Sequence, residues 1–193
     1  MQICFASHNA NKVKELNHIL GGVHEVVSLS ELGLSDEIAE TGSTFEENAF
    51  IKARYVYEKL HIPVFADDSG LIVDALGGEP GVFSARYAGE EKDDEKNIKL
   101  LLQNLEGNEN RSASFKTVIA FIDHKGLPHQ FEGSISGRIV NERRGTNGFG
   151  YDPVFQPDGY QLTFAELSHE EKNRISHRAK AVKLLIAHLH QYQ

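Results

Sequence analysis

Two adjacent carboxylates, Asp67 and Asp68, follow the short apolar run 63–66 and precede Ser69 and Gly70. Such a run predicts a buried strand, and open α/β sheets bind ligands at the carboxyl ends of their strands. Side chains alternate along an extended chain, so one carboxylate can bind a hard cation such as Mg²⁺ while the other holds a water. Taken alone, the pair is explained equally well as two aspartates in a turn.

A second polar group, Ser7-x-Asn9-x-x-Lys12, lies between an apolar run at 2–6 and a helical pattern that begins at Val13. The N–H groups at the start of a helix bind anions, and a lysine one turn in adds a full positive charge. We expect an anion site here, although capping of the helix by Ser7 and Asn9 explains the same residues. No Gly-x-x-x-x-Gly-Lys sequence occurs, which excludes a Walker loop.

Glu40 lies in the acidic, glycine-containing loop 35–43, directly before the sequence Thr44-x-x-Glu47. That sequence matches a capping box, in which Thr44 bonds a free N–H and Glu47 reaches back to the cap. A helix is therefore predicted to begin after Thr44. Glu40 is a candidate ligand for the same cation as Asp68, and an ordinary surface acid is the alternative.

The segment Gly148-Phe149-Gly150 places an aromatic ring between two glycines, and Asp152 follows it. A purine could stack on Phe149 and donate its ring N–H groups to Asp152. Stacking of a base on an aromatic side chain contributes about 1–3 kcal/mol. A turn that simply buries Phe149 is the alternative.

Three potential cations, Lys172, His177 and Arg178, lie within seven residues of an acidic chain. A continuous helix would turn them to different sides, because each residue rotates by about 100°. A shared site therefore requires a break in the helix, and Ser176 as an N-cap would provide it. An exposed basic patch is the alternative.

The remaining pattern indicates an α/β protein. Apolar and alternating runs predict strands at 2–6, 25–29 and 71–73 and an antiparallel ribbon at 114–122 and 130–140 with a turn at 123–126. Helical spacing predicts helices at about 92–105 and 176–189. These elements would bring the polar groups above to the ends of strands and helices.

The 193 residues are 40% hydrophobic and 25% charged, with a formal charge of −8, which is typical of a globular protein. The acidic balance and the lack of a basic stripe argue against a nucleic-acid partner. No apolar stretch approaches the ~18 residues of a membrane span, and no signal peptide is recognisable. We therefore expect a cytoplasmic protein with no membrane partner. The lone Cys4 cannot form an intramolecular disulfide.

Six segments, in order along the chain, together carry a resemblance that none carries alone. They are Ser-His-Asn-Ala-Asn-Lys at 7–12, Thr-Phe-Glu-Glu-Asn-Ala at 44–49, Ala-Asp-Asp-Ser-Gly-Leu at 66–71, Pro-Gly-Val-Phe-Ser-Ala-Arg-Tyr-Ala-Gly at 80–89, Gly-Phe-Gly-Tyr-Asp-Pro at 148–153 and Ile-Ser-His-Arg-Ala at 175–179. The chain resembles the inosine triphosphate pyrophosphatase family. One departure is Ser7, which stands where many relatives carry threonine and keeps the hydroxyl.

The resemblance implies a single two-lobed domain over residues 1–193, with an α/β fold, a long curved mixed β-sheet flanked by helices, and the active site in the cleft between the lobes. It implies a homodimer, and Mg²⁺ as the cofactor with Mn²⁺ as a substitute. Glu40 and Asp68 would bind the metal. Asp68 would also be catalytic, as the proton acceptor for the attacking water, with Asp67 as a supporting carboxylate.

The resemblance also assigns the substrate contacts. The triphosphate would be held by Ser7, His8, Asn9, Ala10, Asn11 and Lys12, with Ser69 as a further contact. The nucleoside would be surrounded by Phe149, Gly150, Tyr151, Asp152, Lys172, His177 and Arg178. Lys52 would reach the phosphates as well.

The implied activity is hydrolysis of ITP, dITP and XTP to the monophosphate and pyrophosphate, with water attacking the α-phosphorus. Arg178 and backbone N–H groups would donate to the 6-oxo group, whereas the 6-amino group of adenine would leave buried donors unpaired. The sequence leaves open which of the three nucleotides is preferred and how guanine is rejected. Two alternatives are a nucleotide-binding regulator, which would not need Glu40 and Asp68, and a pyrophosphatase for modified pyrimidine nucleotides.

Overall fold

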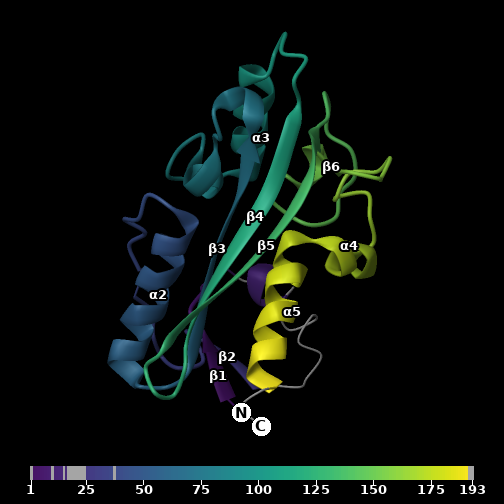
Figure 1. Cartoon of the computed structure of the whole chain (residues 1–193). Coiled ribbons are helices and arrows are strands. Elements are labelled where there is room, and N and C mark those ends of the chain that lie inside the picture. Colours follow the sequence, from purple (N-terminus) through teal and green to yellow (C-terminus); the bar gives the residue numbers. More distant parts are fainter. Residues whose placement is uncertain (1, 10, 15, 17–24, 37, 191–193) are drawn as a thin grey trace. The chain divides into compact units, whose positions relative to one another are not determined.

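The computed structural model describes residues 2–9, 11–14, 16, 25–36 and 38–190. Six strands form one sheet in the order β2-β1-β3-β4-β5-β6 (Figure 1). They are β1 (Gln2–Phe5), β2 (Glu25–Ser28), β3 (Val64–Val73), β4 (Ser112–Ile122), β5 (Pro128–Ile139) and β6 (Phe155–Pro157). β1 is parallel to β2 and to β3, whereas β5 and β6 are antiparallel, so the sheet is mixed.

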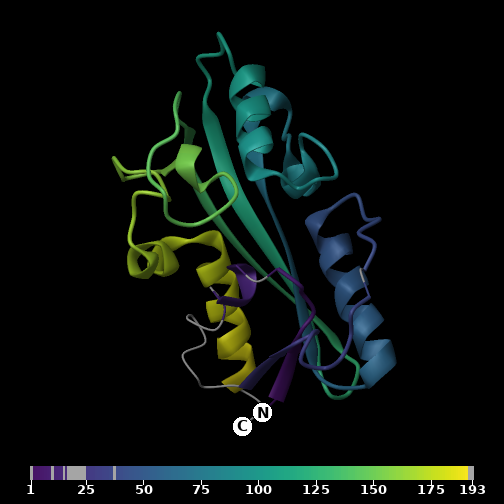
Figure 2. The same cartoon turned by 180° about the vertical axis from the view of Figure 1, so that it is seen from behind.

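Helices flank the strands, and α2 and α5 run beside them on either side (Figures 1 and 2). The helices are α2 (Phe45–Leu60), α3 (Asp94–Asn104), α4 (His169–Ile175) and α5 (His177–Leu189), with short 3-10 turns η1 (Asp74–Leu76), η2 (Gly81–Arg86) and η3 (Asp152–Val154). Residues 11–14 and 16 are helical as well. The predicted α/β class, with a mixed sheet flanked by helices, is confirmed. Among the described residues, no helix has the length and apolar character needed to cross a membrane.

The chain folds into two compact units, each assembled from separate segments. Unit 1 consists of Met1–Asp68, Thr117–Gly133 and Arg178–Gln193, and unit 2 consists of Ser69–Lys116 and Ser134–His177. β3, β4 and β5 therefore each contribute residues to both units. That residues 1–193 form a single two-lobed domain stays a prediction.

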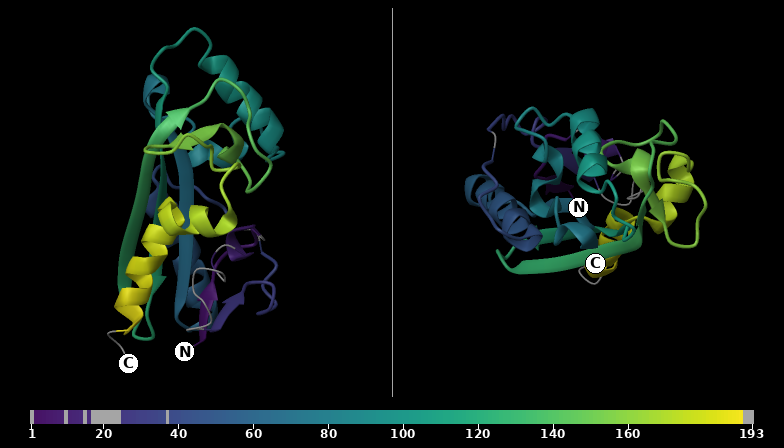
Figure 3. Two further views of the ribbon diagram at one scale, coloured as in Figure 1. Left: turned by 90° about the vertical axis from the view of Figure 1, so that its right-hand side faces the viewer. Right: turned by 90° about the horizontal axis from the view of Figure 1, so that it is seen from above.

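The core of unit 1 joins β1 to α5. Ile3 and Phe5 of β1 and Val182 and Leu185 of α5 are buried in one apolar cluster, and Phe5 stacks on Phe65 of β3 with ring centroids 4.8 Å apart. Figure 3 shows α5 running along the strands. Each fully buried side chain of this size stabilises the fold by about 1.5–3 kcal/mol. The cluster therefore holds α5 against the strands of unit 1.

α2 begins as predicted, because Thr44 Oγ1 accepts the backbone N–H of Glu47 at 3.1 Å. The return bond differs from the prediction. The Glu47 carboxylate accepts the backbone N–H of Ser43 at 2.6 Å and its hydroxyl at 2.8 Å, one residue before the cap. Ser43 offers two donors where Thr44 would offer one N–H, which explains the shift. The buried side of the helix carries Phe45, Asn48, Ala49, Lys52, Ala53 and Val56.

β3 runs without interruption from Val64 to Val73, so Asp67 and Asp68 lie inside a strand. The prediction that the strand ends before them is wrong. Both carboxylates are buried and bonded by neighbouring side chains of unit 1, so the chain can stay extended through residues that would otherwise favour a turn. The expected alternation of side chains still separates the two carboxylates.

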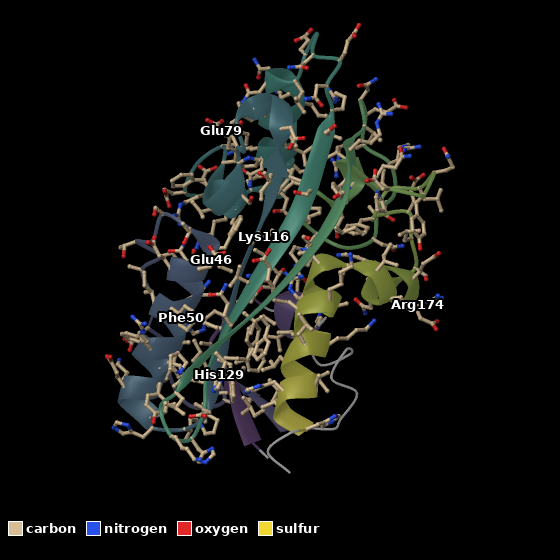
Figure 4. The ribbon with its side chains drawn as sticks, viewed as in Figure 1. Glu46, Phe50, Glu79, Lys116, His129 and Arg174 are labelled. Atoms are coloured by element: carbon tan, nitrogen blue, oxygen red, sulfur yellow. The ribbon has the colours of Figure 1, made fainter. Side chains whose placement is uncertain are left out.

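The turn between β4 and β5 lies where the sequence predicted it. Asp123 Oδ1 accepts the backbone N–H groups of Lys125 at 2.8 Å and of Leu127 at 2.9 Å. Its second oxygen lies 3.3 Å from Nε2 of His129, which Figure 4 labels on β5. One aspartate therefore closes the turn and holds the start of β5 within unit 1.

The core of unit 2 surrounds α3. Asp93 caps this helix by accepting two backbone N–H groups, and Ile98 and Leu101 pack with Phe155 and Phe164 in an apolar cluster. α3 is therefore anchored at its first turn by a cap and along its length by buried leucine and isoleucine.

The predicted helix break occurs at Ser176. α4 ends at Ile175 and α5 begins at His177, with Ser176 extended between them (φ −63°, ψ 155°). The break distributes the basic residues, because Lys172 and His177 belong to unit 2 and Arg178 to unit 1. The three cations expected to share one site therefore come from both units.

Candidate functional site

The loop after β1 in unit 1 is held by its own side chains. Asn9 Oδ1 accepts the backbone N–H groups of Asn11 at 3.0 Å and of Lys12 at 3.2 Å, and Ser7 Oγ accepts the N–H of Asn9 at 3.1 Å. Ser7 and Asn9 therefore cap the first helix, as the simpler interpretation expected. Capping does not exclude an anion site, because it fixes the loop from which Lys12 extends.

His8 ties this loop to the loop that precedes α2. Its Nε2 lies 3.1 Å from the carbonyl oxygen of Asp36, and the Asp36 carboxylate accepts Tyr55 Oη at 2.8 Å and Lys59 Nζ at 2.5 Å from α2. Ala10, which was also predicted to contact the triphosphate, lies outside the described residues. The predicted phosphate-binding loop 7–12 is thus bonded to the loop that carries Glu40, a predicted metal ligand.

Asp67 lies at the centre of an ion-pair group in unit 1. Lys12 Nζ is 3.0 Å from each of its carboxylate oxygens, and Arg178 Nε is 3.6 Å from Oδ2. Burial acts to raise the pKa of Asp67, but the attraction of Lys12, Arg178 and Lys52 outweighs it and holds that pKa far below its usual range. Asp67 is therefore a fixed anion that orients two cations.

Asp68, the next residue, has different partners. Asn48 Nδ2 donates to Oδ2 at 3.1 Å, and Lys52 Nζ lies 3.7 Å from Oδ1. Burial raises the pKa of Asp68, and the pull of Lys52 offsets this effect only in part. A carboxylate with a raised pKa accepts a proton more readily than an ordinary aspartate. Successive residues of β3 thus supply a permanent anion and a proton acceptor.

Glu40 is brought to Asp68 by Lys52 of α2, whose Nζ is 2.5 Å from Glu40 Oε1. Asn48 holds the same loop, because its Oδ1 accepts the backbone N–H of Gly42 at 2.8 Å. A Cβ on Gly42 would lie 2.6 Å from a side-chain carbon of α2, so only glycine allows the loop to approach the helix this closely. The loop is fixed on α2 in a position that pairs Glu40 with Asp68.

Glu40 and Asp68 fit a hard divalent cation. They already share one cationic group, the Lys52 ammonium; burial acts to lower its pKa, but the attraction of Asp68 and Glu40 outweighs burial and raises it. Mg²⁺ is commonly held by one or two carboxylates and completed by substrate phosphates and water. In the part of the chain that the structure describes, no three His, Cys, Asp or Glu side chains form a metal group. Glu40 and Asp68 are thus two carboxylates of the kind that hold such a cation.

The charge balance of this group supports the same interpretation. Three cations face three carboxylates in unit 1: Lys12, Lys52 and Arg178, and Glu40, Asp67 and Asp68. A group that is already neutral cannot by itself compensate the several negative charges of a triphosphate in a buried place. A divalent cation that enters with the nucleotide would supply the missing charge.

Asp152 organises the predicted residues of unit 2. Its Oδ2 accepts Lys172 Nζ at 2.6 Å and the backbone N–H of Phe149 at 3.0 Å. Lys172 Nζ also lies 5.1 Å from the centre of the half-buried Phe149 ring, within cation–π range. A Cβ on Gly148, whose φ is +77°, would lie 1.9 Å from the Asp152 carboxylate. Gly148 is therefore required, because the Asp152 carboxylate occupies the space that any side chain there would need.

The other predicted residues of unit 2 are more deeply placed. His177 is 5% exposed and stacks on Phe115, with ring centroids 4.8 Å apart and an interplanar angle of 11°. The Tyr151 hydroxyl donates to the carbonyl oxygen of Ser84 at 2.8 Å, and burial raises its pKa well above the usual range. Tyr151 therefore holds the loop in place through its hydroxyl, and its contact with the nucleoside stays a prediction. Ser69 is half-buried within β3.

Two residues at these groups were not predicted. Asn48 is fully buried and bonds both Asp68 and Gly42. The available signal was an asparagine inside the predicted helix, past its cap, where this residue is unfavourable. Asp94 accepts the backbone N–H of Gly150 at 2.7 Å; an acid in the first turn of a helix is ordinarily explained by the helix dipole, so its type gave no signal. Lys52 was predicted to reach the phosphates, and the structure places its ammonium beside Glu40 and Asp68.

Comparison with known proteins gives a consistent result. A family model described as the Ham1 family matches residues 3–188. A dITP/XTP pyrophosphatase of Flavobacterium psychrophilum is 51% identical over 186 residues, covering 96% of this chain and 97% of that protein. A dITP/XTP pyrophosphatase of Bacillus licheniformis is 51% identical over 193 residues, covering 98% of each. The structure of the Staphylococcus aureus Ham1 protein matches with a TM-score of 0.91 at 44% identity, and each chain is covered completely.

Proposed function

This chain belongs to the Ham1 family, and on that premise we propose that it hydrolyses non-standard purine nucleoside triphosphates to the monophosphate and pyrophosphate. The substrates are ITP, dITP and XTP, in keeping with relatives that are 51% identical over nearly the full chain and are named dITP/XTP pyrophosphatases. The observation that carries the proposal is Asp68, a buried carboxylate with a raised pKa that shares Lys52 with Glu40.

In the proposed reaction, unit 1 binds the triphosphate and activates water. The capped loop 7–12 and the Lys12 ammonium hold the phosphates and stabilise charge on the leaving pyrophosphate. Asp68 accepts the proton of the water that attacks the α-phosphorus. Burial lowers the pKa of Lys12, and Asp67 offsets part of this effect and orients the ammonium. Glu40 and Asp68 would hold Mg²⁺, or Mn²⁺ in its place, and the cation would screen the phosphate charge when bound.

Unit 2 supplies the recognition of the nucleoside in this proposal. The base stacks on Phe149, and Asp152 forms an ion pair with Lys172, whose ammonium lies over the Phe149 ring. Adenine would place a donor where the site requires an acceptor, so ATP is a poor substrate. The predicted contact of Arg178 with the 6-oxo group requires exchange of its ion pair with Asp67 and stays a prediction, as do the homodimer and the cytoplasmic location.

The decisive experiment is a nucleotide panel with identification of the product. ITP, XTP, GTP, ATP and a modified pyrimidine triphosphate are each incubated with and without Mg²⁺, and pyrophosphate is measured separately from orthophosphate. We expect Mg²⁺-dependent release of pyrophosphate from ITP and XTP, with ATP slower by up to ~10⁴-fold. Equal rates for all bases would refute the base-recognition argument. Binding of ITP without any product would favour a regulator, and preference for the pyrimidine would favour the third alternative.

A further inference from the structure

Two carboxylates hold successive backbone N–H groups of the loop that carries Phe149. The N–H of Phe149 donates to Asp152 Oδ2 at 3.0 Å, inside the loop itself. The N–H of Gly150 donates to Asp94 Oδ2 at 2.7 Å, and Asp94 lies 56 residues away in the sequence. Hydrogen bonds to an ionised acceptor are roughly twice as strong as neutral ones, so this contact is an anchor from outside the loop.

Gly150 is the point of the loop that needs an anchor most. Its φ is +58°, and no atom lies within 4 Å of the position that a Cβ would occupy. Glycine in this left-handed region loses more conformational freedom on folding than other residues do. Packing therefore does not fix this peptide from the side of the missing Cβ. Two hydrogen bonds hold it: its carbonyl oxygen, on Phe149, accepts the N–H of Asp152 at 3.3 Å within the loop, and its N–H donates to Asp94, which lies outside the loop.

The side chain of Asp94 is exposed, but its backbone is anchored. It is the first residue of α3, directly after the cap Asp93, and α3 is locked into the core of unit 2 by Ile98 and Leu101. The next residue, Glu95, forms an ion pair with Arg143 at the other end of the same loop. The first turn of α3 thus contacts the loop at two places.

We propose that Asp94 is a positioning residue for base recognition: by bonding the Gly150 N–H, it fixes the peptide that presents the Phe149 ring to the purine. The inference rests on the proposed function, in which Phe149 receives the base. It assigns a role to a residue outside the six motifs. The competing interpretation is that Asp94 only stabilises the N-terminus of α3 through the helix dipole.

The test compares Asp94→Ala with Asp94→Asn, which keeps an acceptor oxygen without the charge. Glu90→Gln serves as the charge control, because Glu90 is an exposed acid shortly before the same helix. For Asp94→Ala we expect KM for ITP to rise roughly tenfold, the effect of losing a hydrogen bond to a charged group, with kcat changed less than about twofold. Asp94→Asn should recover most of the loss, and Glu90→Gln should behave as the wild type.

Two further measurements separate positioning from a general loss of structure. Inhibition by inorganic tripolyphosphate reports on the phosphate-binding residues of unit 1 and should not change in Asp94→Ala. A rise in its inhibition constant in step with KM would overturn the proposal. The proposal would also be overturned if KM for ITP stayed unchanged in a variant in which the Gly150 amide proton exchanges faster with solvent.

The exchange rate of the Gly150 amide proton, measured by nuclear magnetic resonance, needs no substrate. It should rise at least about tenfold in Asp94→Ala, since it follows local opening. If the wild-type protein released no pyrophosphate from any nucleotide, the proposed function would fail, and this measurement would still test the anchor. An unchanged exchange rate would overturn the anchor even in a fully active enzyme.

Discussion

The two groups of site residues are held in place by different kinds of contact. In unit 1, charged side chains from β3, from two helices and from the loop before α2 pair with one another: Lys12 with Asp67, and Lys52 with Glu40 and Asp68. In unit 2, carboxylates bond the backbone N–H groups of the glycine-containing loop that carries Phe149, and Lys172 of α4 adds one ion pair with Asp152. The first group fixes charges, and the second fixes the path of the chain.

This difference predicts how each group fails. A substitution in the side-chain network of unit 1 changes a charge, so it should act on catalysis and on the pH dependence of stability. A substitution in the loop of unit 2 changes the position of a ring, so it should act on discrimination between bases. A unit 1 variant that changed discrimination between bases, or a unit 2 variant that changed the pH dependence of stability, would contradict this contrast.

The largest effect is expected for Asp68→Asn. Turnover of ITP should fall at least ~100-fold, the scale of a lost general base. Stability near neutral pH should be unchanged or higher: the folded pKa of Asp68 is raised above 3.8, so its ionisation opposes folding once the pH exceeds that folded pKa. Kinetics and urea unfolding measure the two effects, and near-normal turnover in the folded variant would remove Asp68 from the mechanism.

The neighbouring substitution Asp67→Asn should act mainly on stability. Removing one partner from a buried ion pair costs about 3–5 kcal/mol. The folded pKa of Asp67 lies below 3.8, so its contribution is present above that pH and is lost as the pH falls through the folded value. The gap between wild type and variant in urea unfolding should therefore narrow in acid. Asp36→Asn, at the exposed pair with Lys59, is the control and should change little; a gap independent of pH would contradict the assignment.

The members of the unit 1 group could be predicted from the sequence, because its acids and Lys12 lie in the motifs at 7–12 and 66–70 and in the loop around Glu40. The position of Asp67 and Asp68 inside β3 could not. Local composition favours a turn there, and the partner that stabilises the extended chain, Lys12, lies 55 residues away. A pairing of that kind depends on the folded arrangement, which no local pattern encodes.

The same reason explains what was missed in unit 2. The aromatic ring at Phe149 and the acid at Asp152 follow from their spacing to the glycines. The acidic start of α3 matches a solvated helix end so well that the sequence gives no reason to connect Asp94 with Gly150. The helix break at Ser176, by contrast, was predictable, because the functional assignment of residues on both sides required it.

A pair of glycine variants tests the unit 2 side of the comparison. Gly148→Ala and Gly150→Ala both place a side chain at positive φ, which costs roughly 1–2 kcal/mol in each. Only Gly148→Ala also drives a Cβ into the Asp152 carboxylate, at 1.9 Å. It should therefore lower stability more and raise KM for ITP more, while inhibition by tripolyphosphate stays constant in both. Equal effects in urea unfolding and kinetics would mean that Asp152 does not depend on Gly148.

The smallest effect is expected for Thr44→Ala, which removes the cap of α2 and leaves every charge of unit 1 in place. Loss of an N-cap costs typically about 1 kcal/mol, and Thr44→Ser should restore it. Because Asn48 and Lys52 project from the first two turns of α2, a helix that frayed at its start would also lower kcat/KM. We expect a lower Tm with kcat/KM unchanged, since Phe45 and Ala49 stay packed in the core. A fall in kcat/KM that Thr44→Ser reverses would show that the unit 1 charges depend on the local backbone after all, and the contrast with unit 2 would be lost.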